Sequence, residues 1–184
     1  TLMEVLPKLP PNLPAAVFLV QHMPASFMST FAVRLGRACS LRVVEAKAGM
    51  AVEAGVCYVA PGGLHLCLSY DRLKGSPVIR TPDRPATMFM PSVSVMMASV
   101  RETFGADTVG VLLTGIGNDG VDEMLALHQA GCHTIAESQE SADRSRRRQG
   151  GRSELGYRAA YHPRCGIGTD DDNSRSGLQA GRFR

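Results

Sequence analysis

The sequence contains no tryptophan, and aromatic residues make up only 5% of its 184 residues. Long hydrophobic runs are also missing: stretches such as Ala15–Val20 are far shorter than the roughly 20 residues of a membrane helix. No basic segment leads into a hydrophobic one at the start, as it does in a signal peptide. These absences predict a cytoplasmic chain with no membrane span and no secretory leader.

The five cysteines form no CxxC pair, and their number is odd. Disulfide frameworks and zinc sites normally use paired cysteines at short, regular spacings. We therefore expect free thiols, no metal and no disulfide framework.

Charge and hydrophobicity divide the chain near residue 141. Residues 142–184 contain ten Arg and five acidic residues, a net charge of +5, so residues 1–141 carry −2 of the total of +3. About half of residues 1–141 are apolar, against about a quarter of residues 142–184. We predict one folded domain over residues 1–141 and a disordered tail over residues 142–184, without helix or strand. The chain starts at Thr1, which indicates a fragment.

Apolar runs alternate with helical patterns along residues 1–141. The sequence predicts strands, helices bounded by capping or glycine residues, a hairpin partner for the second strand, and a loop. The predicted strands are Ala15–Val20, Gly55–Ala60, Thr108–Leu113 and Cys132–Ala136. The first predicted helix is capped by Ser26 and has Phe27, Phe31 and Leu35 on one face; the second starts at Pro91-Ser92 and presents Met96 and Met97; the third is Val121–Ala130. The hairpin partner is Leu64–Leu68, and the loop is Asp71–Ala86. This alternation predicts an α/β fold, with a doubly wound, mostly parallel sheet and helices on both faces.

Two loops that follow buried strands carry the candidate catalytic residues. His22 follows the first strand, and Asp119 lies in a glycine-rich turn after the third. In open parallel sheets, sites form at the carboxyl ends of strands. A histidine held by a carboxylate is the base and orienting acid of a nucleophilic hydrolase.

Simpler interpretations of the same residues stay open. His22 alone could be an ordinary loop histidine, and Asp119-Gly120 a turn. Gly115, Gly117 and Gly120 also match GxGxxG, which binds phosphate in dinucleotide sites; the acidic residue would then be Glu137 or Glu140. We expect His65 to brace the preceding Pro61-Gly62-Gly63 turn, with a role in the site as the less favoured alternative. We expect His128 and His133 to serve packing or the surface.

Four segments together resemble the CheB-type chemotaxis methylesterase domain. They are LVQHMPASF (Leu19–Phe27), GVCYVAPGGLHL (Gly55–Leu66), PSVSVMMASV (Pro91–Val100) and GVLLTGIGNDGVD (Gly110–Asp122). The resemblance implies protein-glutamate methylesterase and glutamine deamidase activity on the cytoplasmic helices of methylated chemoreceptors. It places the catalytic histidine on His22 and the aspartate on Asp119, beside the active-site neighbours Gln21, Met23, Thr114, Gly115, Ile116 and Gly117. It implies no cofactor and no metal. Many members of the family carry an aspartate at the position of Ser94. Members also commonly carry a regulatory receiver domain, and this chain is too short to include one.

Two departures from the family pattern stand out. The family's nucleophilic serine lies in a glycine-rich turn just before the segment that matches Thr1, so we expect this chain to lack the nucleophile and to hydrolyse no ester. We expect Ser26 to cap a helix and not to substitute for this serine. After Ser141 the family pattern stops, and we hypothesise that residues 142–184 are translated out of frame.

Two other classes of function stay open. The chain could be a receptor-binding pseudoenzyme that has lost its serine, which the upstream sequence would reveal. The arginine-rich tail could bind nucleic acid, but a solvated charge run is the more common role of such a segment, and we do not expect a nucleic-acid partner.

Overall fold

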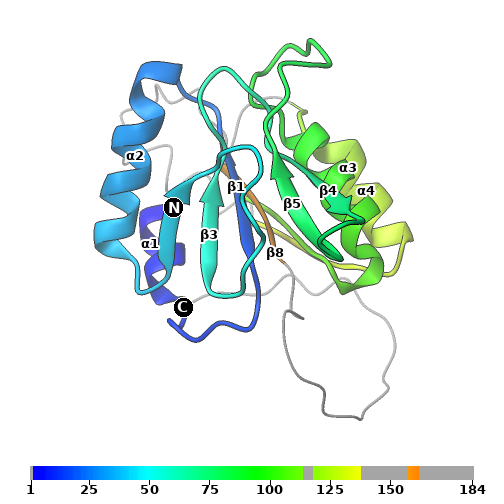
Figure 1. Cartoon of the computed structure of the whole chain (residues 1–184), viewed down its shortest axis with the longest axis horizontal. Helices are drawn as coiled ribbons and strands as arrows, with labels where there is room; N and C mark the ends of the chain where they lie inside the picture. The colour runs from blue at the N-terminus through cyan, green and yellow to red at the C-terminus, as the bar shows by residue number, and fades with distance from the viewer. Residues whose placement is uncertain (1, 114–117, 138–156, 162–184) are drawn as a thin grey trace.

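A computed structural model describes residues 2–113, 118–137 and 157–161 (Figure 1). Within these ranges the main sheet has six strands in the order β2-β3-β1-β8-β6-β7. Their bounds are β1 Val17–Gln21, β2 Arg42–Glu45, β3 Val56–Val59, β6 Val109–Leu112, β7 His133–Ala136 and β8 Tyr157–Tyr161. The helices are α1 Leu2–Val5, α2 Ala25–Ala38, α3 Val93–Phe104 and α4 Val121–Gln129, with short 3-10 turns at Leu6–Lys8 and Gly105–Asp107.

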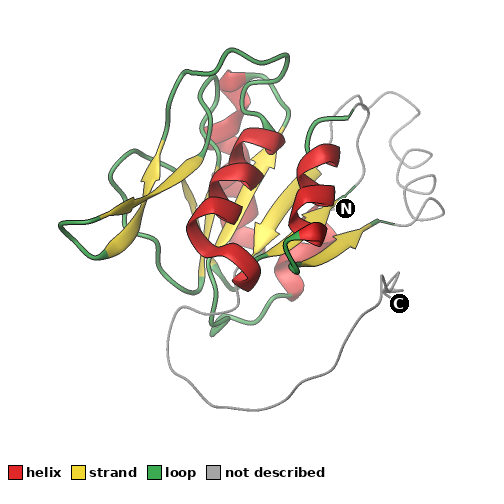
Figure 2. Ribbon diagram, turned by 90° about the vertical axis from the view of Figure 1, so that its right-hand side faces the viewer, coloured by secondary structure: helices red, strands yellow, loops and turns green. Residues whose placement is uncertain are grey.

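The main sheet confirms the predicted fold class. Strand β3 pairs in parallel with β1 and β2, and β6 pairs in parallel with β7. Helices lie in front of and behind the sheet (Figure 2). None of the helices in the described part of the chain is long and apolar enough to cross a membrane.

Strand β8 differs from the prediction for residues 142–184. It runs antiparallel between β1 and β6 and pairs with both, from Val17–Tyr161 to Gln21–Tyr157 on β1 (Figure 1). The prediction of no strand in this segment is therefore wrong at Tyr157–Tyr161. The other residues of the predicted tail lie outside the described ranges.

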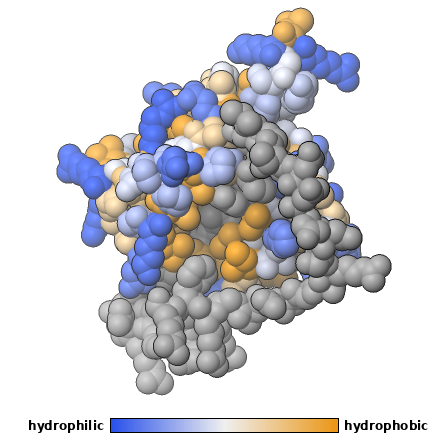
Figure 3. All heavy atoms as spheres, turned by 90° about the horizontal axis from the view of Figure 1, so that it is seen from below, coloured by the Kyte–Doolittle hydropathy of each residue, from blue (hydrophilic) through white to orange (hydrophobic). Residues whose placement is uncertain are grey.

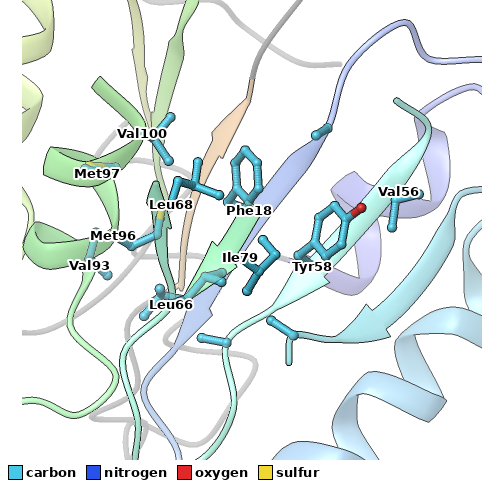
Figure 4. Packing of buried hydrophobic residues seen from close by; sticks show 14 of the residues in the cluster. Phe18, Val56, Tyr58, Leu66, Leu68, Ile79, Val93, Met96, Met97 and Val100 are labelled. Carbon is cyan, nitrogen blue, oxygen red and sulfur yellow. The ribbon is translucent and has the colours of Figure 1, made fainter. Parts of the chain in front are cut away.

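Strand β1 contributes to two hydrophobic cores because its side chains alternate between the faces of the sheet. Phe18 and Val20 belong to the core that contains the α3 residues Met96 and Met97 (Figure 4). Val17 and Leu19 belong to the core on the other face, beneath α1 and α2. The Phe18 ring also stacks on Tyr58 of β3, with ring centroids 5.7 Å apart. The sheet is therefore covered on both faces, as the continuous apolar run of β1 predicts.

Helix α2 begins two residues earlier than its sequence suggests. Pro24 occupies the N-cap position, so the prediction that Ser26 caps the helix is wrong. The buried residues are Met28, Ala32 and Leu35. Phe27 precedes Met28 and lies outside this buried face, with 60% of its surface exposed. Its spacing of four from Phe31 had predicted that the two residues share one face of the helix.

The predicted hairpin was placed wrongly. Cys67–Asp71 (β4) pairs antiparallel with Ser76–Arg80 (β5) and not with β3, which has β1 and β2 as neighbours. Part of the predicted Asp71–Ala86 loop is therefore a strand. This two-stranded sheet packs beside α3, where Leu66, Leu68 and Ile79 join the core with Met96 and Met97.

Strand β2 was not predicted, whereas the predicted start of α3 agrees with the structure. Ser92 caps α3, and its side-chain oxygen accepts a hydrogen bond from the Val95 N–H. The cysteines among the described residues, Cys39, Cys57, Cys67 and Cys132, are free thiols.

Figure 3 views the molecule from below, where hydrophobic and hydrophilic residues are interspersed. The loops that carry His22 and Asp119 follow the carboxyl ends of β1 and β6.

Candidate active site

His22 and Asp119 meet in space although 97 residues separate them in the sequence. His22 directly follows β1, and Asp119 lies in the turn before α4. The Nε2 atom of His22 lies 2.8 Å from Oδ2 of Asp119. Both side chains are buried, with relative exposures of 8% and 9%. The pair predicted from the sequence is thus formed by the fold.

The carboxylate of Asp119 is held by the first turn of α3. Oδ1 accepts hydrogen bonds from the Ser92 hydroxyl and the Ser94 N–H, both at 2.9 Å. Oδ2 accepts the Val93 N–H at 2.7 Å in addition to His22. Backbone N–H groups at the start of a helix have no partner within the helix, so they stabilise an anion placed there.

These contacts keep Asp119 ionised. Burial alone raises the pKa of Asp119, but hydrogen bonds from His22 and from the N–H groups of Ser94 and Val93 outweigh it. The net effect is a pKa of Asp119 well below its ordinary value. An ionised carboxylate accepts hydrogen bonds and cannot donate them, so the Nε2 of His22 must carry the proton in their shared bond.

This assignment leaves the other ring nitrogen of His22 as the base. Nδ1 is buried and has no hydrogen-bond partner among the residues that the structure describes. In the neutral ring with its proton on Nε2, Nδ1 carries a lone pair. The arrangement can therefore accept a proton at Nδ1 while Asp119 stabilises the resulting imidazolium through Nε2.

The plane of the His22 ring is also fixed by an aromatic contact. Phe89 stacks on it with ring centroids 4.5 Å apart and an angle of 8° between the planes. Phe89 belongs to the segment that connects β5 to α3. One edge of the imidazole is therefore held by Asp119, and one face is covered by a hydrophobic ring.

The predicted neighbours divide into two groups. Gln21 is fully buried at the end of β1, and its side-chain amide donates to the carbonyl oxygen of His22 at 3.3 Å. Met23 is half-buried and packs on the α2 side of the sheet. Thr114, Gly115, Ile116 and Gly117 lie outside the described residues, and so do two of the three glycines of the GxGxxG motif.

Sequence reasoning missed several residues of the site. Ser92 was predicted only as part of a helix start, yet its hydroxyl contacts Asp119. Ser94 was noted only for the aspartate common at its position; its hydroxyl accepts the Gly120 N–H at 2.7 Å. The PSVS run at the helix start could have drawn attention to these serines. No sequence signal indicated Phe89.

Other candidate ligands are not assembled with this pair. His128 and His133 are exposed, on α4 and at the start of β7. Glu137 follows β7, where its N–H donates to the Leu112 carbonyl, and Glu140 lies outside the described ranges. Across residues 2–113, 118–137 and 157–161, no group of three His, Cys, Asp or Glu is placed to hold a metal ion.

Comparison with known proteins points to one family. The model of the family described as CheB methylesterase matches residues 1–146. Protein-glutamate methylesterase/protein-glutamine glutaminase 3 of Syntrophomonas wolfei is 52% identical over 139 residues, which are 76% of this chain and 39% of that protein. The corresponding enzyme of Caldanaerobacter subterraneus is 45% identical over 144 residues, 77% of this chain and 39% of that protein. The chain thus spans about two fifths of the length of these relatives.

The fold also resembles that of a member of this family. The crystal structure of the Thermotoga maritima CheB methylesterase catalytic domain superimposes with a TM-score of 0.72 at 34% identity, covering 76% of this chain and 73% of that one. With the sequence matches and the buried His22–Asp119 pair, this likeness shows that the chain belongs to the CheB methylesterase family.

Proposed function

We propose that this chain supplies the general base and its orienting acid for hydrolysis of glutamyl methyl esters in proteins, and of glutamine side-chain amides. The observation that carries the proposal is the geometry of His22. Its Nε2 is bonded to the ionised Asp119, while its buried Nδ1 has no partner in the described structure. A base with one nitrogen committed and the other able to take a proton is what acyl transfer from a hydroxyl nucleophile requires.

The reaction would proceed in two steps. A serine hydroxyl attacks the ester carbonyl as His22 Nδ1 takes its proton, and the imidazolium returns that proton to the departing methoxide, which leaves as methanol. Water then attacks the acyl-enzyme with His22 again as base, releasing glutamate and the serine. With a glutamine substrate the leaving group is ammonia. Asp119 stays ionised throughout and stabilises the imidazolium.

The nucleophile is the part that we do not assign within these 184 residues. The hydroxyl of Ser92, close to the pair, is committed to Asp119. Ser26 lies exposed within α2. We therefore keep the expectation that this polypeptide by itself hydrolyses no ester, and that the serine belongs to the glycine-rich turn that the resemblance places before Thr1.

The relatives' names give the substrate class, protein-glutamate methyl esters and protein glutamines. We propose methylated chemoreceptor helices in the cytoplasm as the partner that presents these groups, and a receiver domain as the regulatory partner.

A gain-of-function fusion tests the proposal. The serine turn of the Thermotoga maritima domain is joined ahead of Thr1, and methanol release from a methylated receptor is measured for the fusion and for the 184-residue chain. We expect release from the fusion alone. His22→Gln or Asp119→Asn in the fusion should lower the rate by about 10⁴-fold, as removal of triad partners does elsewhere. Release that survives both substitutions would contradict the assigned roles. Methanol release by the unfused chain would contradict the expectation that these 184 residues lack the nucleophile.

A further inference from the structure

The segment of residues 81–92, between β5 and α3, supplies two contacts to the His22–Asp119 pair. Phe89 stacks on the ring of His22, and the hydroxyl of Ser92 donates to Asp119. Between these contacts and β5, the residues from Asp83 to Met88 are exposed, and Met88 is 90% exposed. Within this stretch the Thr87 hydroxyl donates to the Phe89 carbonyl. An exposed stretch buries few side chains of its own, so contacts with the rest of the fold also help to define its path.

His65 provides such contacts. It lies between β3 and β4, and its side chain is fully buried. Its backbone N–H donates to the Pro82 carbonyl at 2.9 Å, and its ring Nε2 lies 2.8 Å from the Pro85 carbonyl oxygen. Its ring Nδ1 accepts the Ser92 N–H at 3.1 Å. One residue thus holds the beginning, the middle and the end of the 81–92 segment.

The two ring bonds require a single state of His65. A carbonyl oxygen only accepts hydrogen bonds, so Nε2 must carry a proton; the Ser92 N–H only donates, so Nδ1 must be unprotonated. Both nitrogens of the neutral ring are therefore used. A hydrophobic residue of similar size could fill the space, but it would leave the Ser92 N–H and the Pro85 carbonyl without these partners.

The bond to Ser92 links His65 to the candidate catalytic pair. Ser92 gives its N–H to His65 and its hydroxyl to Asp119, which in turn accepts from His22. Buried hydrogen-bond networks of this kind fix one arrangement of their members.

From these contacts we infer that His65 is a positioning residue of the active site. It holds the 81–92 segment so that Phe89 stacks on His22 and Ser92 bonds to Asp119. The inference corrects the expectation that His65 braces the Pro61-Gly62-Gly63 turn, because its ring bonds go to Pro85 and Ser92. The inference depends on the proposed function only because it describes the His22–Asp119 pair as catalytic.

Nuclear magnetic resonance of the 184-residue chain tests this without ester turnover. The ring protons of His22, assigned by comparison with His22→Gln, should be shifted upfield by the ring current of the stacked Phe89. Phe89→Leu gives the position of these signals without stacking. In His65→Leu we expect them to move most of the way to that position, while methyl signals of Met28 and Leu35 on the other face of the sheet stay in place. Unchanged His22 signals in a folded His65→Leu protein would overturn the inference.

Conservative variants separate positioning from simple packing. His65→Asn keeps an acceptor near Nδ1 and should restore much of the His22 signal position. His65→Gln keeps a donor near Nε2 but loses that acceptor, so hydrogen exchange at the Ser92 amide should become at least tenfold faster. If His65→Leu does not fold, the His65→Gln comparison decides: an unchanged Ser92 exchange rate and unchanged His22 signals would refute the positioning role.

A matched control uses another histidine. His128 is exposed on α4, so His128→Leu should leave the His22 ring signals unchanged. Because these readouts need no substrate, they can hold while the fusion shows no ester hydrolysis. The inference and the proposed function therefore fail separately.

Discussion

Gly62 lies directly against Ala25, the first residue of α2. A Cβ atom placed on Gly62 would overlap the Cα of Ala25 and lie 2.7 Å from its Cβ. The turn after β3 and the start of the helix that follows His22 are therefore packed backbone to backbone. This contact fixes the start of α2, where the loop of residues 22–24 from β1 ends.

Replacement of Gly62 by alanine should consequently destabilise the protein. The added methyl group meets backbone atoms that cannot move aside, and overpacking of this kind costs about 1–3 kcal/mol. Urea unfolding measures the loss. Gly36→Ala is the control: it lies inside α2, and its Cβ would be 3.5 Å from that of Val43, an ordinary contact. That variant should be neutral or up to about 1 kcal/mol more stable. Equal effects of the two substitutions would contradict the packing.

Asp119→Asn should lower stability in a pH-dependent way. At neutral pH we expect a loss of about 3 kcal/mol, because a buried charged acceptor with four donors is replaced by a neutral amide. The folded-state pKa of Asp119 lies below its ordinary value of 3.8, so the stability it contributes is full above that value. It is lost as the pH falls further, toward the folded-state pKa.

Unfolding of both proteins at pH 7, 4 and 2.5 measures this dependence. The difference between them should be similar at pH 7 and 4 and smaller at pH 2.5. A difference that grows between pH 4 and pH 2.5 would contradict a lowered pKa of Asp119.

Cys57 should be unreactive in the native protein. It is buried in β3, and burial raises the pKa of its thiol to about 12, so almost none of it is thiolate at neutral pH. Iodoacetamide labelling followed by mass spectrometry should modify Cys39, which is half-buried, before Cys57. Cys57 should react readily once urea unfolds the chain. Rapid labelling of Cys57 in the native state would contradict the burial of β3.

Ala160→Pro tests the placement of β8. Ala160 lies opposite Phe18 of β1 and Gly110 of β6, so a proline there removes a backbone donor from the middle of the sheet. We expect a loss of about 3 kcal/mol or more, or aggregation through the exposed edges of β1 and β6. Ala160→Ser keeps the N–H and should be much milder. Equal stability of the two variants would show that β8 does not hold this position.

The reading frame of residues 142–184 is testable in the coding DNA. We keep the hypothesis of a frame error near Ala142, which the abrupt gain of arginine and glycine suggested. A frame shift at that point should reveal an apolar, family-like continuation. If no shifted frame does so, the hypothesis is wrong, and β8 then belongs to the native chain.

The sequence was informative wherever one segment determines its own structure. The run from Ala15 to Val20 predicts β1 because every side chain in it is apolar. Pro91-Ser92 predicts the start of α3 because these residue types are common at the first positions of a helix. Strand β2 was missed because Arg42–Glu45 is short and only partly buried. Strand β5 was missed because Pro77 and the neighbouring prolines are typical of loops.

The site was predictable only in part for a related reason. His22 and Asp119 could be paired because both follow strands whose carboxyl ends share one edge of the sheet. The contacts of Ser92, Phe89 and His65 depend on the path of residues 81–92, which no local pattern determines. A network that joins four segments through backbone donors leaves no regular spacing in the sequence.

The burial of β1 on both faces has a consequence for how the protein unfolds. Phe18 and Leu19 are adjacent in sequence but belong to different cores, so neither core can open without loosening the strand that both share. The two sides of the sheet should therefore unfold together, with the amides of β1 among the last to exchange. His22, one residue beyond this strand, is attached to the most persistent part of the fold.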